Sequence, residues 1–131
     1  MTESSHREDE VFQFILDKID SVPHLEALLL LWNTRPQGWS EVTLAARLHV
    51  NPGVAEKLLH DLHRDELAAI APAAPDLYCY RSESPEKDDL IGALDATYRR
   101  QLVRISTMIH GKASSAIRDF AKAFRITKEQ K

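Results

Sequence analysis

Apolar residues recur every three or four positions over most of the chain, which predicts a mainly helical protein. This spacing begins at Val11 and Phe14 and predicts a first amphipathic helix over about residues 8–20. Residues 25–32 are almost entirely apolar, so we expect the second helix to be buried on all sides. Residues 1–7 are polar, and we expect this terminal segment to be disordered.

Two shorter helices are predicted next, on either side of a tight turn. Ser40 is a favourable N-cap for the first of them, because its hydroxyl oxygen accepts a hydrogen bond from an amide of the first helical turn. Asn51 followed by Pro52 marks the start of the other, with a cap and then a first helical residue that needs no amide hydrogen. That helix runs to about Arg64, and we expect Val50 to fill the turn.

A β-hairpin is predicted after this pair of helices. The helical spacing stops near residue 67, and two short segments typical of strands follow at residues 68–71 and 77–81. The segment between them, residues 72–76, contains two prolines and an aspartate and is typical of a turn. Helix, turn, helix and hairpin therefore follow one another directly.

The last third of the chain predicts a long helical segment. Ser84, Pro85 and Glu86 have the cap, proline and acidic residue of a helix start, and the apolar stripe continues to about residue 126, with Gly111 as a candidate kink. Such a helix exposes more apolar surface than residues 1–81 can cover, which predicts a homodimer. The expected interface residues are Tyr98, Leu102, Ile105, Met108, Ile109, Ile117, Phe120 and Phe124.

Two alternatives remain for this long segment. Its apolar residues before Gly111 are equally compatible with a place in the core of their own chain. The basic residues along it are also compatible with a helix lying on a membrane surface, although nothing else in the sequence is typical of a membrane protein.

The order of elements resembles that of winged helix-turn-helix proteins, particularly bacterial MarR-type regulators. The resemblance rests on LAARLHVNPGVAEKLLHDLHRDEL at residues 44–67 and on the hairpin at 68–81, and the flanking helices match only in layout. It implies a mainly α fold with a small β-hairpin (α+β), flanked by N-terminal helices and a long C-terminal helix. The domain layout is a disordered segment at 1–7, a winged helix-turn-helix domain at 8–83 (motif about 40–65, wing about 68–81) and a helical dimerisation segment at 84–126.

The resemblance also implies a function. In such proteins the second helix of the motif enters the major groove of DNA, so we expect a cytoplasmic, bacterial-type transcription regulator that binds double-stranded DNA as a homodimer. Lys57 is expected at a guanine edge or a phosphate, His60 at a base edge and Arg64 at the backbone. The full set expected to face DNA is Asn51, Glu56, Lys57, His60, Arg64 and Arg81, with Gly53 and Ala55 beside them.

The distribution of charge favours a second hypothesis. The net charge is −3, but residues 1–91 hold 8 Lys and Arg against 17 Asp and Glu, which gives −9, whereas residues 92–131 hold 9 against 3, which gives +6. The predicted recognition helix itself carries Glu56, Asp61, Asp65 and Glu66, whereas DNA affinity depends largely on cations near phosphates. The alternative function is a protein–protein interaction adaptor. The basic C-terminal stretch is compatible with packing on the acidic body or with an anionic partner.

Other classes of function find no support in the sequence. Cys79 is the single cysteine, so neither an internal disulfide nor a cysteine-rich zinc spacing is available. Glu56, His60, Asp61 and His63 have helical spacing that a metal site would use, but a solvated polar face explains them better. No nucleophile with a paired base and no glycine-rich phosphate loop is present, so we expect neither an enzyme nor a bound cofactor.

Overall fold

The structure of the protein, a computed structural model, describes residues 2–112. It confirms a mainly helical fold with one antiparallel hairpin. The elements are α1 (Thr2–Lys18), α2 (Val22–Thr34), α3 (Glu41–Leu48), α4 (Pro52–Arg64), β1 (Ala68–Ala71), β2 (Ala74–Tyr80) and α5 (Pro85–Arg100), followed by a further helical stretch at 102–112.

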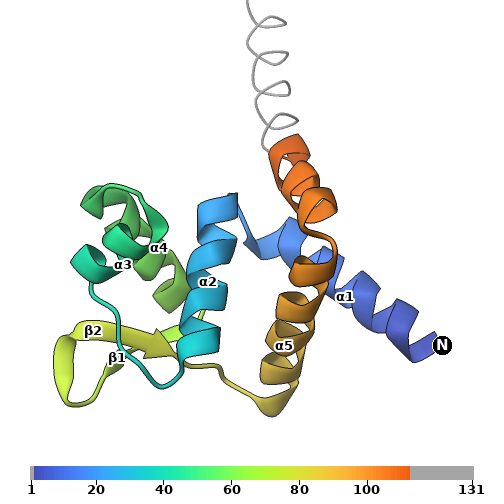
Figure 1. The fold of residues 1–131 in the computed structure, drawn as a ribbon. Coiled ribbons are helices and arrows are strands. Elements are labelled where there is room, and N and C mark those ends of the chain that lie inside the picture. Colours follow the sequence, from blue (N-terminus) through green and yellow to red (C-terminus); the bar gives the residue numbers. More distant parts are fainter. Residues whose placement is uncertain (1, 113–131) are drawn as a thin grey trace, which may run out of the picture.

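Helix α2 occupies the middle of the molecule (Figure 1). It contacts α3, α4 and the hairpin on one side and α5 on the other. Leu25, Leu28 and Leu31 of α2 are completely buried, as the apolar run at 25–32 predicts. Because burying one leucine side chain contributes about 1.5–3 kcal/mol, α2 is the main hydrophobic connection between the two sides.

The predicted helix-turn-helix is present in α3 and α4. The Ser40 hydroxyl accepts from the Thr43 amide at 3.1 Å, and the Thr43 hydroxyl accepts from the Ser40 amide at 2.9 Å, which forms a capping box. His49, which adopts the left-handed backbone conformation, follows the end of α3 and begins the turn. Asn51 then caps α4, with its side-chain oxygen accepting from the Val54 amide at 2.9 Å.

The hairpin is tighter than the sequence predicts. β2 begins at Ala74 rather than near Leu77, so the turn comprises only Pro72 and Ala73. A register irregularity between Ile70 and Ala71 places Ala71 opposite Ala74 and permits this short connection. The hairpin also has a third participant that the sequence analysis missed. Trp39 pairs with Tyr78 of β2 through two backbone hydrogen bonds of 2.7 and 2.8 Å.

Helix α1 begins at Thr2, so the prediction of a disordered segment at 1–7 and a first helix from about residue 8 is wrong within the described residues. The polar first turns are held by a tertiary contact. The Glu8 carboxylate accepts a hydrogen bond from the Gln101 side chain at 3.1 Å and pairs with Arg104 at 3.6 Å. Hydrophobic spacing carries no information on such a polar contact.

The predicted long C-terminal helix is interrupted at Gln101 in the described part. Gln101 has φ −127° and ψ 44°, outside the helical region, so α5 ends at Arg100 and helix resumes at residue 102. This break lies ten residues before Gly111, the predicted kink; Gly111 itself is helical, and the residues beyond 112 lie outside the described part of the chain. Figure 1 shows the chain changing direction at this break, which lays residues 102–112 alongside α1.

Candidate nucleic-acid interface

Helix α4 has one buried face and one exposed face. Leu58, Leu59 and Leu62 are buried against the rest of the domain, and Ala55 is completely buried with them. The expectation that Ala55 faces DNA is therefore wrong. The absence of a large side chain at this position suits the close contact between α3 and α4.

The exposed face carries most of the predicted DNA-contacting residues. Glu56, Lys57, His60 and Arg64 are all exposed on α4, and Asn51 is exposed at its cap. The Asn51 side-chain oxygen accepts from the Val54 amide, which orients the side-chain NH2 group as a donor for a ligand. The structure thus brings five of the six predicted residues to one helix.

Arg81 lies apart from the others. It is exposed after the end of β2, where its backbone amide donates to Leu67 at 3.1 Å. It borders a small cleft with His63 and Glu66, near the C-terminal end of α4. Arg81, which was predicted to contact DNA alongside Lys57, therefore lies at the opposite end of α4 from Asn51.

Both basic side chains of α4 are engaged by a residue that the sequence analysis did not include among the candidate contacts. Lys57 lies 2.8 Å from one carboxylate oxygen of Asp61, and Arg64 lies 3.2 Å from the other. Arg64 also contacts Asp65 at 3.3 Å. The i,i+4 and i,i+3 spacing of these residues was available in the sequence, but the burial of Asp61 was not.

A cleft of about 760 Å³ separates α4 from the hairpin. Its walls are the start of α3, the first half of α4 and the outer part of β2. Three carboxylates, those of Glu41, Glu56 and Asp76, border it together with Lys57 and His60. This cleft could not be predicted from the sequence, because its walls are far apart along the chain. Its charge is unfavourable for a phosphate group lying deep inside it.

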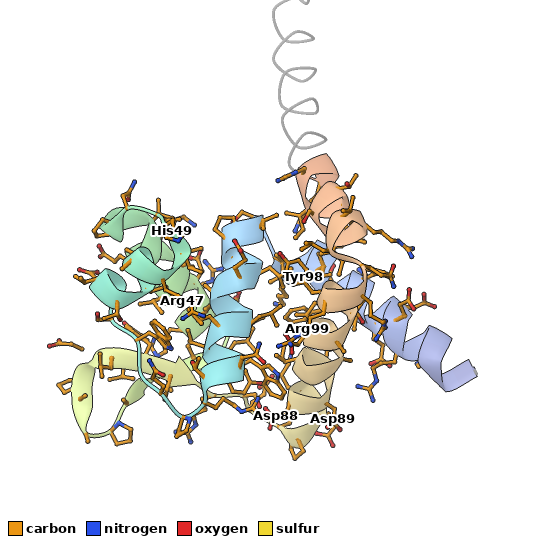
Figure 2. The ribbon with its side chains drawn as sticks, in the orientation of Figure 1. Arg47, His49, Asp88, Asp89, Tyr98 and Arg99 are labelled. Carbon is orange, nitrogen blue, oxygen red and sulfur yellow. The ribbon has the colours of Figure 1, made fainter. Side chains whose placement is uncertain are left out.

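The hairpin is fixed to its neighbours by side-chain contacts near its base, away from the turn. The His63 ring packs edge-on against Tyr78 with ring centroids 5.7 Å apart. Asp88, at the start of α5 (Figure 2), accepts hydrogen bonds from Ser82 at 2.6 Å and Tyr80 at 2.8 Å. The bond from Ser82, then that from Tyr80, holds the pKa of Asp88 below its ordinary value. The wing is thereby tied to α4 and to α5.

A second cleft, of about 440 Å³, lies between α2, α3 and α5. Figure 2 shows Arg47 on α3 and Tyr98 and Arg99 on α5, all of which border it. Arg99 spans from α5 to α2, since it pairs with Asp95 at 3.2 Å and donates to the Asn33 side chain at 3.0 Å. Burial, with the nearby charge of Glu26, raises the pKa of Tyr98.

The predicted dimer interface is only partly available on the surface. Ile105 and Ile109 belong to the hydrophobic core of their own chain, with 0% and 1% exposure, so their assignment to an interface is wrong. The break at Gln101 turns their face toward α1, which explains the difference. Tyr98 and Met108 are half-buried, whereas Leu102 is 51% exposed beside Val103 at 77%. Ile117, Phe120 and Phe124 lie outside the described residues.

Two further properties of the described part bear on function. No helix within residues 2–112 has both the length and the hydrophobicity needed to cross a bilayer. In the same range, no group of three His, Cys, Asp or Glu side chains is arranged to hold a metal ion.

The fold was compared with those of known proteins. The sequence matches no family model and no curated protein. Among solved structures, MepR, a transcription regulator of the Staphylococcus aureus multidrug efflux pump MepA, superposes with a TM-score of 0.51 at 12% identity, covering 99% of this chain and 94% of MepR. A MepR mutant bound to an oligodeoxyribonucleotide gives 0.50 at 11% identity, with the same coverage.

A MarR family protein of Mycobacterium tuberculosis is also among the matches, with a TM-score of 0.46 at 15% identity over 96% of this chain and 85% of that one. At such low identities the two MepR superpositions speak for the fold alone. They cover nearly the whole of both chains, so the likeness includes the flanking helices as well as the motif. The chain has the winged helix-turn-helix fold of these transcription regulators.

Proposed function

We propose that this protein is a cytoplasmic, bacterial-type transcription regulator that binds double-stranded DNA through α4. The observation that carries the proposal is the two-faced character of α4 within a winged helix-turn-helix. Ala55, Leu58 and Leu62 anchor the helix, while Glu56, Lys57 and His60 project from the opposite face beside the hairpin. This is the arrangement with which such motifs place a helix in the major groove.

The charge of the site defines what kind of binding to expect. Lys57 and Arg64 are the cations of the exposed α4 face, and carboxylates surround both. Since general DNA affinity grows with the number of phosphates neutralised, we expect weak binding with a shallow dependence on salt. Contacts to base edges then account for a larger share of the binding free energy than in a strongly basic motif.

Fluorescence anisotropy with labelled genomic DNA fragments tests the proposal. Wild-type protein is expected to bind at low ionic strength and to dissociate as salt is raised. Lys57→Ala and Arg64→Ala are each expected to weaken binding, whereas Lys18→Ala, an exposed change on α1, is expected to leave it unchanged. Absence of salt-dependent binding at low ionic strength contradicts the proposal, and unchanged affinity of both α4 variants means that a different surface contacts DNA.

We also propose that the regulator acts as a homodimer that uses its C-terminal helical segment. Support comes from the exposed pair Leu102 and Val103, which follows the break at Gln101. Two apolar side chains exposed side by side favour association. Sedimentation at micromolar concentration is expected to give a species of twice the 14.9 kDa chain mass. A species of 14.9 kDa alone rejects the dimer and leaves the DNA proposal standing.

A specific observation favours a second candidate, a protein-interaction adaptor. The cleft beside α4 is bordered by Glu41, Glu56 and Asp76, and Val42 at its edge is 65% exposed. An acidic cleft with an apolar rim suits a basic partner segment better than a phosphate backbone. A pull-down that recovers a stoichiometric protein without nucleic acid, and loses it on Glu56→Lys, favours the adaptor; retention after this charge reversal contradicts it.

A further inference from the structure

Asp61 is an ionised side chain in an unusual place on α4. The residue is only 5% exposed, and Asp61 is one of three polar residues that are buried in the described part of the chain. Burial raises the pKa of a carboxyl group, but here the hydrogen bond and charge of Lys57, together with the charge of Arg64, outweigh burial and keep the pKa of Asp61 below its ordinary value. The carboxylate therefore remains charged at neutral pH.

The two carboxylate oxygens of Asp61 are divided between two cations. One oxygen accepts from Lys57 at 2.8 Å and the other from Arg64 at 3.2 Å. The partners are mostly solvent-exposed, with 73% and 58% of their side chains accessible, whereas the Asp61 side chain is 7% accessible. A group fixed inside the domain thus holds the ends of two flexible side chains on the surface.

This arrangement gives the exposed face of α4 a defined geometry. Lys57 and Arg64 lie seven residues apart, which corresponds to about 10 Å along the helix axis. Without a common anchor, each of these long side chains would sample many rotamers. With it, both cations converge on one point of the helix, the carboxylate of Asp61.

The same contact has a cost in general affinity for DNA. A carboxylate beside each cation competes with phosphates and reduces attraction that is independent of sequence. If net charge alone decided affinity, α4 would bind DNA more tightly without Asp61. In return, Asp61 orients the two cations. Hydrogen bonds to base edges depend on the direction of the donor, so this orientation affects them directly.

We infer that Asp61 is a positioning residue that sets the sequence preference of α4 by holding Lys57 and Arg64 in one arrangement. The inference rests on the proposed DNA-binding function and adds a determinant of specificity to it. Asp65 does not fill this role, because it reaches Arg64 but has no contact with Lys57 among the described residues.

The test compares Asp61→Asn with Glu66→Gln in the full chain. Both variants remove one negative charge, one within α4 and one just beyond its C-terminal end, but Glu66 is exposed, lies outside the predicted DNA-contacting set and makes no ion pair in the described part of the structure. The preferred duplex is first selected by wild-type protein from a randomised library. Dissociation constants are then measured for this duplex and for a scrambled duplex of the same composition, at one salt concentration.

Glu66→Gln is expected to keep the wild-type ratio of the dissociation constant for the scrambled duplex to that for the preferred duplex within about twofold, since only net charge has changed. Asp61→Asn is expected to lower the ratio by about tenfold, the scale of one well-oriented side-chain contact to a base, mainly by tighter binding to the scrambled duplex. An unchanged ratio in a folded Asp61→Asn protein overturns the inference, as does an equal loss in both variants.

A measurement on the wild-type protein keeps the inference testable if Asp61→Asn does not fold. Side-chain NMR order parameters are compared for the ammonium groups of Lys57 and Lys18, since Lys57 pairs with Asp61 and Lys18 is exposed and has no ion pair among residues 2–112. A more ordered Lys57 is expected, and equal mobility of the two overturns the inference. If the wild-type protein binds no duplex at low salt, the proposed function has failed, whereas the NMR result still reports on the anchor alone.

Discussion

The helix-turn-helix with its hairpin and the layer formed by α1, α5 and residues 102–112 are organised in different ways. In the first region, each helix start is stabilised by a hydrogen bond between residues close in sequence: Ser40 accepts from Thr43, and Asn51 accepts from Val54. In the second, positions are set by contacts across more than ninety residues, such as Gln101 with Glu8. Local chemistry defines the first region, and tertiary contacts define the second.

The largest expected effect tests whether the second region is held by its own core. Ile105→Ala is expected to lower the free energy of unfolding by about 2–5 kcal/mol, because Ile105 is completely buried within the chain. Leu16→Ala, on α1 in the same layer, is expected to cost much less, because its side chain is 44% exposed. Chemical denaturation at two protein concentrations measures both variants. A small, concentration-dependent loss for Ile105→Ala would instead place this residue between protomers.

The next effect tests the local character of the first region. Asn51→Ala is expected to destabilise the protein by about 0.5–2 kcal/mol, since the Val54 amide loses its side-chain acceptor. Asn51→Asp retains an acceptor and is expected to remain within about 0.5 kcal/mol of wild type. Urea unfolding monitored by circular dichroism checks the pair. Equal stabilities of the alanine and aspartate variants would mean that the cap contributes nothing.

The difference between the regions explains how far the sequence could predict the fold. Asn51-Pro52 and Ser84-Pro85 predict the positions of two helix starts from only a few residues each, and both starts are confirmed. The break at Gln101 has no glycine or proline to announce it. His49 and Glu66 adopt left-handed backbone conformations, with φ 58° and 62°, without the glycine that usually marks them. In the candidate site, Lys57 and Arg64 were predictable from the motif, whereas Asp61 as their buried anchor required coordinates.

A pH-dependent effect tests the contact between the two regions. His24 is 2% exposed in the first turn of α2, where its Nδ1 accepts from the Asp20 amide at 3.2 Å. Burial lowers the pKa of His24 from 6.5, although the charges of Asp20, Asp61 and Asp65 oppose the shift. Since the unfolded chain takes up this proton at higher pH than the folded one, stability is expected to fall as pH drops below 6.5, by at most about 1.4 kcal/mol per pH unit.

Thermal unfolding between pH 7.5 and 5 measures this dependence. His24→Asn keeps an acceptor for the Asp20 amide but does not titrate, so its melting temperature is expected to depend less on pH than that of wild type. The same slope in both proteins would assign the pH dependence to other groups.

The smallest effect concerns a single long-range contact. The Lys112 ammonium donates to the Ile19 carbonyl at 2.8 Å and lies 3.4 Å from the Ile15 carbonyl, at the C-terminal end of α1. Cations at this end of a helix stabilise it, so Lys112→Met is expected to cost about 0.3–1 kcal/mol, with less effect at high salt. Arg81→Met removes an exposed cation outside this contact and serves as the control. Matched losses for the two variants would show that only net charge matters.

The pairing of Trp39 with Tyr78 has a consequence for solubility. Strands that leave backbone amides and carbonyls open along an outer edge can recruit strands from other molecules and form aggregates. Trp39 occupies the middle of the β2 edge that faces away from β1 and is itself buried, with 6% exposure. The other outer edge of this small sheet is that of β1, which is four residues long and consists mainly of alanine. One tryptophan in a loop thus shortens the stretch of β2 edge on which another strand could pair.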